Sequence, residues 1–494
     1  MVVPSTRWRY LFLLGTLAVF LVACSPLSAD PTHESIMPDD PTLPPPTAIG
    51  MPTAVEVSPF SEYRIVMALD TVGQRVDGKQ RVTYPNHTGV ELEEIVFRLY
   101  PNLPQYGGTM TVGPVWVDGA RHDSSLRADT TSLAIRLHRP LAPERSVTIE
   151  FTYDIKLPVR ESGYNLFGYS QGIWSLPDAY PLLAVHDGEM WHEDVAPAHG
   201  DAVFADAALY DVTVTLPPTQ TLVTTGSVLT ETVDVNGQHS YRISGGPLRE
   251  FAFLASDQYQ MAETKAYGTV LRSYYLPGDE ASGQATLNIS AAALRSYEDA
   301  YGPYPFDEMI VAEAPLQYYG MEYPGLNLIG SSLYREQRDE LENRVVHEIA
   351  HQWWYAQVGN DQVNTPWLDE GLAEYSMAIY YYQVFGEARA NTLVNQRWLV
   401  PYQVAVENEY DAVVNQPSSA FTWEYEVIVY AKAALFFSAL HQELGDETFK
   451  AIMREYVSQF RWRVATPDDL LEVAESVSGQ DLDGLYNRWI LSKQ

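Results

Sequence analysis

Apolar and polar residues alternate with a period of two along much of the first half of the chain. In the segment SVTIEFTYDI, every second residue from Val147 to Ile155 is apolar, which places these side chains on one face of an extended strand. The segment YDVTVTLPP repeats the pattern from Tyr210 and ends at two prolines. Turn sequences such as VNGQ and PNHTG separate segments of this kind. We therefore predict an antiparallel β-sheet domain over residues 59–277.

The pattern changes to helical spacing in the second half. The segment ATLNISAAALRSYEDAYG predicts a helix that ends at Gly302, and PYPFDEMIVAEAP predicts a turn into a strand. From Arg335 onward, apolar residues recur at helical intervals. The longest predicted helices cover residues 341–358, 368–385, 427–444 and 449–460. We therefore predict a second, mainly helical domain over residues 278–494.

The N-terminus has the features of an export signal. Arg7 and Arg9 precede an apolar segment, Tyr10–Ala23, that is too short to span a bilayer comfortably. The segment ends in LVAC, which resembles the lipobox of bacterial lipoproteins. That resemblance implies a signal peptide over residues 1–23 and lipidation of Cys24, with the protein exported and anchored to the bacterial cell membrane. An uncleaved anchor and a chance cysteine are the alternatives.

Composition limits the remaining possibilities. Residues 24–58 are rich in proline and poor in apolar residues, which predicts a disordered tether. The net charge of −33 argues against a nucleic-acid partner. Cys24 is the only cysteine in the sequence, so an intramolecular disulfide is impossible. None of these features predicts an oligomeric state.

The segment NRVVHEIAHQWW contains two histidines four residues apart. On a helix, Leu341, Val345 and Ile349 form one apolar stripe, while His347 and His351 lie on the other side. The spacing places both imidazoles one turn apart, as two nitrogen ligands of a single zinc ion require. The alternative is a buried helix whose histidines are satisfied by hydrogen bonds within the core.

A third ligand favours the metal site over the buried helix. Glu370 follows His351 after eighteen intervening residues, at the start of another predicted helix. Two imidazoles and one carboxylate form the ligand set of zinc hydrolases and leave one position open for water. Glu348 would lie beside the metal, where it could act as the general base for that water. We therefore predict one Zn²⁺ per chain.

Two further segments accompany the metal motif. The sequence HExxH, eighteen residues and Glu resembles the signature of the aminopeptidase N-like gluzincins, peptidase family M-one. YYGMEYPG, at residues 318–325, resembles the Gly-Ala-Met-Glu-Asn motif of that family, and VYAKAALFF, at residues 429–437, resembles its Tyr-x-Lys-Gly segment. The resemblance implies a multidomain fold, in which a saddle-like antiparallel β-sheet domain precedes an α+β thermolysin-like catalytic domain that is mainly helical.

The resemblance also implies roles for individual residues. Glu322 would bind the free α-amine of a peptide, next to Gly320 and Met321 in the substrate site. Tyr430 would donate its hydroxyl to the oxyanion, and Glu374 would support a histidine ligand. Without the metal motif, GMEYPG is an ordinary turn, Tyr430 a core aromatic residue and Glu374 a solvated carboxylate. The strand Met309–Ala314 is expected to be the sheet edge on which the peptide pairs.

Several positions depart from the pattern of the family. Tyr323 stands in place of the asparagine of the first motif, and Ala433 stands in place of the glycine of the second. Residues 190–211 match the corresponding family segment poorly, so no substrate contact from the β domain can be carried over. Three histidines in or near this segment fit no helix face, and we expect loop histidines rather than a second metal site: His186, His192 and His199.

Three functions remain open at this point. The first is a zinc aminopeptidase that removes N-terminal residues from peptides outside the cytoplasm. The second is a thermolysin-like zinc endopeptidase, which would use the same metal and base but ignore Glu322. The third is an inactive surface binding protein on a peptidase scaffold, which the intact catalytic groups argue against.

Overall fold

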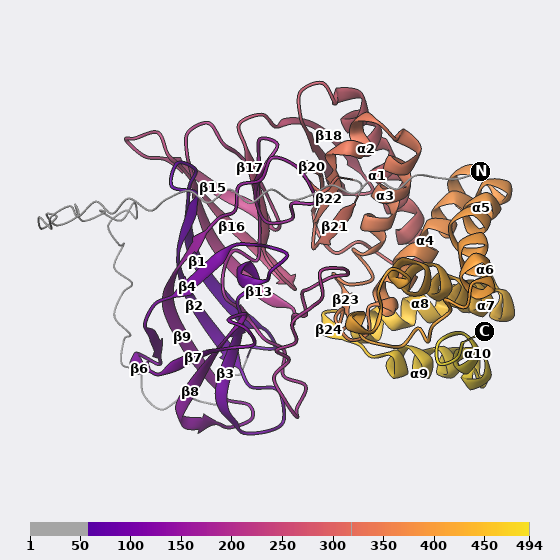
Figure 1. Ribbon diagram of the computed structural model, residues 1–494, viewed down its shortest axis with the longest axis horizontal. Coiled ribbons are helices and arrows are strands. Elements are labelled where there is room, and N and C mark those ends of the chain that lie inside the picture. The colour runs from indigo at the N-terminus through magenta and orange to yellow at the C-terminus, as the bar shows by residue number, and fades with distance from the viewer. Residues whose placement is uncertain (1–57, 318, 494) are drawn as a thin grey trace, which may run out of the picture. The chain divides into compact units, whose positions relative to one another are not determined.

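The computed structural model of the protein describes residues 58–317 and 319–493 (Figure 1). The predicted signal segment, Cys24 and nearly all of the predicted tether lie outside the described residues, and they stay predictions. Within the described ranges, no helix combines the length and the apolar character that crossing a bilayer requires.

The largest sheet of the first half has nine strands and includes the segments with the clearest alternation. Its order is β15-β16-β13-β1-β2-β9-β5-β6, with β4 also paired to β9. Alternate residues of β9 and β13 are buried, as the period of two predicts. All pairs in this sheet are antiparallel except β1 with β13, which run parallel. The strands are β1 (Ser61–Asp70), β2 (Arg75–Pro85), β4 (Thr109–Val112), β5 (Val115–Val117), β6 (Ala120–His122), β9 (Ser146–Lys156), β13 (Ala208–Leu216), β15 (Ser227–Val233) and β16 (His239–Leu248).

Two four-stranded sheets complete the strand-rich region. Their orders are β10-β11-β17-β14 and β12-β3-β8-β7. The strands are β3 (Leu92–Arg98), β7 (Ser124–Arg127), β8 (Ser132–Leu141), β10 (Gly168–Ser170), β11 (Ile173–Pro177), β12 (Leu182–Leu183), β14 (Thr221–Thr224) and β17 (Ala252–Ser256). A short 3₁₀ helix, η1 (Tyr100–Asn102), follows β3.

A five-stranded sheet joins the strand-rich region to the helices. Its order is β18-β19-β20-β22-β21, with β18 (Gln260–Ala266), β19 (Thr269–Tyr275), β20 (Glu308–Ala314), β21 (Gly320–Tyr323) and β22 (Leu326–Gly330). Ile310 and Ala312 belong to the buried cluster of the strand-rich region, whereas Met309 and Val311 belong to the helical cluster. The sheet is therefore buried on both faces, which explains why β20 is apolar at both alternating positions.

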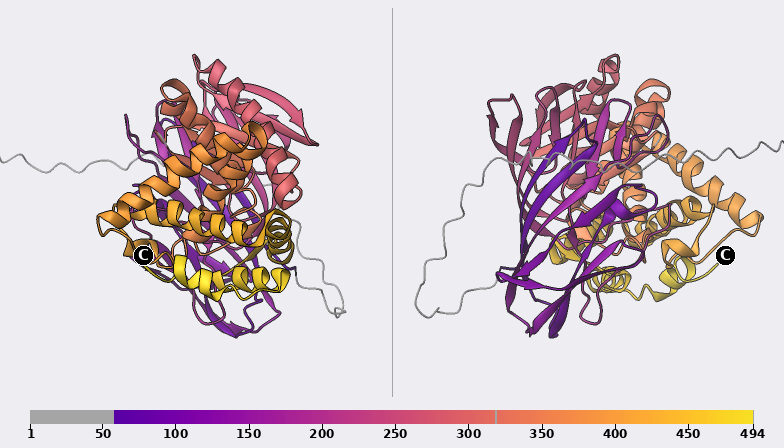
Figure 2. Two further views of the ribbon diagram at one scale, coloured as in Figure 1. Left: turned by 90° about the vertical axis from the view of Figure 1, so that its right-hand side faces the viewer. Right: turned by 60° about the vertical axis from the view of Figure 1, so that its left-hand side comes forward.

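Helices cover the face of the five-stranded sheet on which Met309 and Val311 lie, and they form most of the C-terminal half (Figures 1 and 2). The α-helices are α1 (Glu280–Tyr301), α2 (Ser331–Arg335), α3 (Arg338–Ala350), α4 (Trp367–Phe385), α5 (Glu387–Leu393), α6 (Val400–Glu407), α7 (Ala433–Leu444), α8 (Asp446–Phe460), α9 (Pro467–Ser478) and α10 (Asp483–Trp489). Two π-helical segments, η2 (Val394–Leu399) and η4 (Glu426–Lys432), a 3₁₀ helix, η3 (Ser418–Ala420), and a strand pair, β23 (Val358–Gly359) with β24 (Arg463–Val464), complete the set.

These elements confirm the predicted fold class, a β-sheet region followed by a mainly helical α+β region. Helix α1 ends at Gly302, as predicted. The helix expected over residues 341–358 ends earlier, at Ala350, because the chain turns after His351 and Tyr355 takes a φ of 125°. The hairpin of β18 and β19 pairs with β20, so this sheet uses residues on both sides of position 278. The boundary between residues 277 and 278 stays a prediction.

Candidate active site

Helix α3 presents both histidines of the HExxH segment in its last turn and at its C-terminus. Leu341, Val345 and Ile349 are buried in the helical core, which confirms the predicted apolar stripe. His347 and His351 are also buried, and their exposed fractions are 3% and 1%. The amphipathic pattern of this helix therefore anchors one face and aims the two imidazoles at the same region on the other.

Helix α4 brings the third predicted ligand to the two imidazoles. Glu370 lies in its first turn, and Oε2 of this carboxylate is 3.1 Å from Nε2 of His347 and 3.3 Å from Nε2 of His351. The two Nε2 atoms are 3.2 Å apart. Ligands of a tetrahedral zinc at bond lengths of ~2.0–2.1 Å are separated by about 3.3 Å. The three atoms therefore have the spacing of a shared zinc ion, and they form one of the candidate metal groups among the described residues.

The outer nitrogen of each imidazole faces an acceptor. Nδ1 of His351 is 2.8 Å from the carbonyl oxygen of Trp354, and Nδ1 of His347 is 3.1 Å from Oε2 of Glu374. The second contact is a close charge contact rather than a well-aligned hydrogen bond. Such contacts hold the Nε2 atoms toward a metal.

Glu374 is itself fixed by neighbouring side chains. Its Oε1 accepts hydrogen bonds from Nε of Arg397 at 2.8 Å and from Nε1 of Trp398 at 2.7 Å. Burial raises the pKa of Glu374, but Arg397 and His347 outweigh it and hold this pKa well below the ordinary value. Glu374 is 2% exposed, so it is not the solvated carboxylate of the alternative interpretation.

The electrostatics of the triad favour a bound cation. Burial lowers the pKa of His351, yet Glu322 and Glu370 raise it well above its ordinary value. Burial raises the pKa of Glu370, but hydrogen bonds to His347 and His351 bring it well below its ordinary value. The buried carboxylates therefore require positive charge at this point, which a divalent ion supplies in place of protons.

Glu348 lies beside the triad and does not belong to it. Ligating atoms of Glu348, Glu322 and His351 all lie within 4.8 Å of one another. Burial raises the pKa of Glu348, while His347 and Arg344 lower it in part. Nη1 of Arg344 is 3.7 Å from Oε1 of Glu348. A Cβ at Gly320 would lie 2.1 Å from Oε1 of Glu348, so a larger residue at this position would displace the Glu348 carboxylate.

The segment GMEY forms the edge of the five-stranded sheet. Strand β21 pairs only with β22 in the described sheet, whereas β20 lies between β19 and β22. The expectation that Met309–Ala314 forms the free edge is therefore wrong, because the parallel strand β22 covers it. The free edge belongs to β21, which carries Gly320, Met321 and Glu322.

Glu322 points into the same region as the metal ligands. Its Oε1 accepts a hydrogen bond of 3.0 Å from Nε2 of Gln362, which also donates to Asp369 at 2.7 Å. Glu322 is 5% exposed. Burial, opposed by His351 and reinforced by Glu348 and Glu370, raises the pKa of Glu322 to about 8. A substrate ammonium would stabilise its charged form.

Tyr430 also reaches the metal ligands. Its hydroxyl donates a hydrogen bond of 2.5 Å to Oε1 of Glu370, and its ring stacks on His347 with a centroid distance of 5.9 Å. The residue lies on the π-helical segment η4, a form of helix that is rare and often occurs at functional sites. Two residues later, Lys432 is fully buried and bonds to Asp411 at 2.7 Å, which ties η4 to the preceding loop.

A cleft of about 530 Å³ opens over these groups. The C-terminal half contributes Tyr355 and Trp423 together with the predicted metal ligands, Glu348, Tyr430 and the residues of β21. The strand-rich region forms another wall of the cleft, with Tyr106, Tyr164, Asp201, Val203 and Glu250. Asp201 and Val203 belong to residues 190–211, which match the family segment poorly. Burial, reinforced by Glu322 and Glu370, raises the pKa of Asp201 well above its ordinary value. Asp201, Glu250, Tyr355 and Gln362 are among the cleft residues that the sequence did not single out.

The two departures from the family motifs both fall on packed positions. Tyr323 is 2% exposed and lines the cleft, and its hydroxyl has no partner among the described residues. A Cβ at Gly371 of α4 would lie 2.6 Å from Cβ of Ala433. The two helices therefore approach closely at this point, with the glycine on α4 rather than on α7.

The three histidines of the loop region each have other partners. His186 packs on Trp191, His192 lies 3.0 Å from Asp187, and His199 bonds to the carbonyl oxygen of Ser418 at 3.0 Å. None of them belongs to a candidate metal group in the described part of the chain.

Comparison with known proteins finds a similarity between the helical half and a known peptidase domain. Residues 285–489 match the Peptidase family M1 domain. The chain is 29% identical over 263 residues to an alanine/arginine aminopeptidase of Saccharomyces cerevisiae, a match covering 48% of this chain and 29% of that protein. It is 27% identical over 263 residues to aminopeptidase 2, mitochondrial, of the same yeast, covering 48% of this chain and 26% of that protein. The matches thus span under a third of these curated relatives.

Similarity to solved structures extends over most of the chain. An M1 zinc metallopeptidase from Deinococcus radiodurans has a TM-score of 0.67 at 20% identity, covering 88% of this chain and 94% of that chain. A mutant of an M1 zinc metallopeptidase from the same organism, bound to a Tyr-Ser-Ala substrate, has a TM-score of 0.66 at 20% identity, covering 87% and 94%. These likenesses establish the fold, including the strand-rich region.

The fold resembles that of the solved M1 zinc metallopeptidases, and His347, His351 and Glu370 could hold a metal ion. The match of residues 285–489 to the M1 domain supports a zinc metallopeptidase with zinc as its cofactor.

Proposed function

We propose that the protein is an aminopeptidase that hydrolyses the N-terminal peptide bond of peptides. The observation that carries the proposal is the position of Glu322, whose carboxylate lies within 4.8 Å of ligating atoms of Glu348 and His351. The α-amine and the carbonyl carbon of one residue are only two bonds apart. An amine held by Glu322 therefore brings the carbonyl of the same residue to the metal, which selects the first peptide bond.

The chain's own residues supply the remaining chemistry. Bound zinc polarises the scissile carbonyl and lowers the pKa of water. Glu348 would accept a proton from the attacking water and pass it to the leaving amine, because it lies beside the predicted triad of His347, His351 and Glu370. The Tyr430 hydroxyl, which lies at Glu370, donates to the oxyanion as the carbonyl becomes tetrahedral.

The comparisons support this proposal in part. The relatives named above are aminopeptidases, and the Deinococcus radiodurans mutant was solved with a tripeptide substrate. An endopeptidase would use the same metal and base, so the role of Glu322 is the feature that separates the two activities. An inactive binding protein would have no need for Glu348 and Tyr430 beside an intact triad.

Blocking the α-amine tests the role of Glu322. We expect the protein to cleave peptides with a free N-terminus and to leave their N-acetylated forms intact, because acetylation removes the ammonium that Glu322 binds. We also expect Glu322→Gln to lower kcat/KM for free-amine peptides by about 100-fold, since losing one partner of a buried charge pair costs about 2–5 kcal/mol. Chromatography of the products, with rates measured for the wild-type protein and for Glu322→Gln, checks both results. Cleavage of acetylated peptides at internal bonds would instead establish an endopeptidase.

The lipid anchor is part of the proposal and depends on the sequence alone. The lipobox-like LVAC segment and the proline-rich stretch after it support an exported protein held at the bacterial membrane through Cys24. We expect the full-length protein, expressed in a bacterium with radiolabelled palmitate, to carry label and to sediment with membranes. Cys24→Ser should abolish the label. Persistent label in this variant would contradict lipidation at Cys24.

A further inference from the structure

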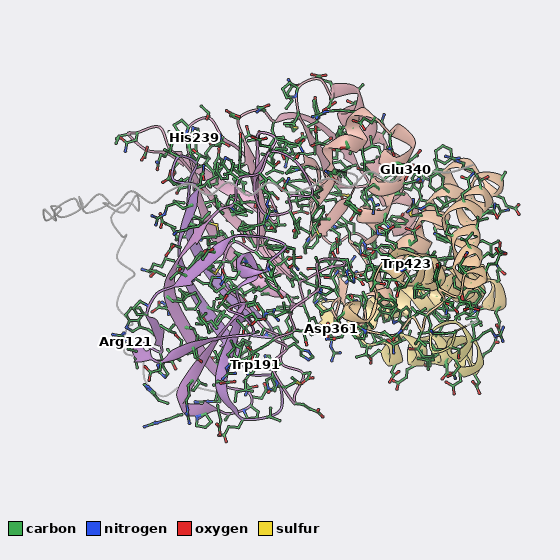
Figure 3. All side chains as sticks on the ribbon, in the orientation of Figure 1. Arg121, Trp191, His239, Glu340, Asp361 and Trp423 are labelled. Atoms are coloured by element: carbon green, nitrogen blue, oxygen red, sulfur yellow. The ribbon has the colours of Figure 1, made fainter. Side chains whose placement is uncertain are left out.

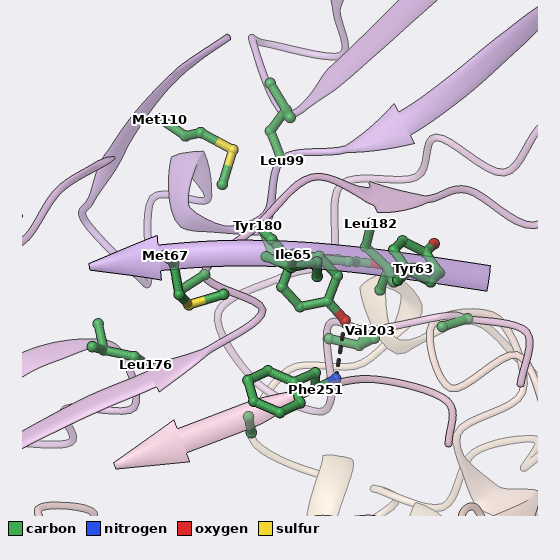
Figure 4. Packing of buried hydrophobic residues seen from close by; sticks show 14 of the residues in the cluster. Tyr63, Ile65, Met67, Leu99, Met110, Leu176, Tyr180, Leu182, Val203 and Phe251 are labelled. Carbon is green, nitrogen blue, oxygen red and sulfur yellow. Dashed lines mark hydrogen bonds between the residues drawn. The ribbon is translucent and has the colours of Figure 1, made fainter. Parts of the chain in front are cut away.

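Two buried carboxyl groups, those of Asp178 and Glu250, lie side by side in the strand-rich region, and Glu250 lines the cleft. Asp178 follows β11, and Glu250 lies between β16 and β17. The backbone N–H of Asp178 donates to the carbonyl oxygen of Phe251 at 3.2 Å, and the N–H of Phe251 donates to the Tyr180 hydroxyl at 3.0 Å (Figure 4). These bonds fix the two segments against each other. Asp178 and Glu250 are 0% and 2% exposed.

Neither carboxyl group receives the hydrogen bonds that buried oxygens require. Both oxygens of Asp178 and Oε2 of Glu250 have no hydrogen-bond donor among the described residues. The Tyr355 hydroxyl donates to the other oxygen of Glu250. Buried carboxylates without donors are costly and uncommon. The two groups must therefore share a proton with each other or accept a donor from outside the chain.

The adjacent arginine does not fill this role. Arg249 is fully buried, but its guanidinium donates to backbone carbonyl oxygens, including those of Tyr355 at 2.5 Å and Arg463 at 2.7 Å. Burial raises the pKa of Asp178 to about 7, and burial together with Asp178 raises that of Glu250 well above its ordinary value. A cation bound at the pair would favour the charged forms of both carboxyl groups.

Glu250 is one of the residues that line the substrate cleft, as is Glu322 of the proposed amine site, and it is 2% exposed. It lines the cleft together with Tyr106, Tyr323 and Tyr355. Tyr323 directly follows Glu322 on β21, and its buried hydroxyl is also without a partner in the described structure. Aromatic rings of this kind cover the methylene stem of a long basic side chain and attract its charged end.

The charge of the cleft favours the same kind of ligand. Arg344 is the one arginine or lysine that lines it within the described residues. Six carboxyl groups line it: Asp201, Glu250, Glu322, Glu348, Glu370 and Glu426. When all six are ionised, one zinc ion, Arg344 and a bound amine offset four of the six negative charges.

We propose that Glu250, supported from behind by Asp178, binds the ammonium or guanidinium group of an N-terminal lysine or arginine of the substrate. The proposal deepens the aminopeptidase function above and rests on it. Glu250 is the specificity-determining residue, and Asp178 is a positioning residue that holds it. The bound cation donates to the carboxylate of Glu250, the one of the two carboxyl groups that lines the cleft.

The test compares anilides of lysine and arginine with that of methionine, which has an unbranched, uncharged side chain. We expect the wild-type protein to show kcat/KM values at least about 10-fold higher for the two basic substrates, as one charge-assisted hydrogen bond provides. Glu250→Gln should remove this preference, mainly through KM, and should leave the methionine anilide within about threefold. This variant keeps an acceptor for the Tyr355 hydroxyl. Asp178→Asn should weaken the preference in the same direction.

Glu426→Gln is the matched control, because it removes one negative charge from an exposed position at the same cleft. We expect it to keep at least half of the preference. An equal loss in this variant would overturn the proposal, since general acidity would then explain the preference. A wild-type protein without the preference, or Glu250→Gln slowing all three anilides equally, would overturn it as well.

A binding measurement separates failure of this proposal from failure of the aminopeptidase function. If no anilide is cleaved, the proposed function fails. Thermal melting in the presence of free L-lysine or L-norleucine then tests whether Glu250 binds a basic side chain. Protection by L-lysine that exceeds that by L-norleucine, and that is lost in Glu250→Gln, supports the pocket. Equal protection by both amino acids, or protection by neither, contradicts it.

Discussion

Glu348→Gln lowers kcat for free-amine peptides by about 10³-fold while the protein keeps one zinc ion. A general base contributes about 10²–10⁴-fold, and Glu348 serves two proton transfers in the proposed reaction. Glutamine has the same shape, so it fills the space between Gly320 and Arg344 without being able to accept the proton. The metal ligands are untouched. Steady-state kinetics and the zinc content of the purified variant check the two parts of this result.

Glu342→Gln is the matched control for this substitution. Glu342 lies on the same helix and accepts a hydrogen bond from the Tyr380 hydroxyl, which glutamine can also accept. We expect its kcat to stay within about twofold of wild type, the range of a substitution that removes no catalytic group. A kcat close to wild type in Glu348→Gln would remove this residue as the base.

His351→Ala abolishes both zinc binding and hydrolysis. It removes one of three ligating atoms that lie 3.1–3.3 Å apart, and it leaves Glu370 buried with one cationic partner fewer. Losing a residue that only orients a ligand weakens metal binding by about 10–100-fold, so losing the ligand itself costs more. Metal analysis after dialysis, together with the rate at saturating peptide, measures the effect.

His239→Ala provides the comparison for the histidine substitution. His239 lies on the hairpin of β15 and β16, away from the helical region (Figure 3). Its zinc content and activity should equal those of the wild-type protein. Normal zinc content in His351→Ala would show that the ion is bound elsewhere.

Local periodicity accounts for the parts of the fold that the sequence predicted well. Alternation along β9 and helical spacing along α3 each reflect one buried face, and burial confirms both. The HExxH spacing also predicted the approach of His347 and His351, because a helix converts four residues into one turn. Helical spacing alone does not predict the position of Glu370, because only the packing of α4 against α3 brings this residue to the imidazoles.

Features that depend on long-range packing were not visible in the sequence. The order of the five-stranded sheet makes β21 the edge, although the apolar strand β20 precedes it in the chain. Asp178 and Glu250 are separated by more than seventy residues, and no periodic pattern marks either of them. Their significance depends on burial and on missing donors, which only coordinates reveal. The π-helical form of η4 likewise departs from the spacing that predicts an ordinary helix.

The metal centre is tested most directly by anomalous diffraction from crystals of the purified, zinc-loaded protein, collected on both sides of the zinc absorption edge. We predict one strong peak, within about 2.0–2.2 Å of Nε2 of His347, Nε2 of His351 and the Glu370 carboxylate. A peak bound by other side chains, or no peak between these three, would contradict the assignment of a zinc hydrolase site to this chain.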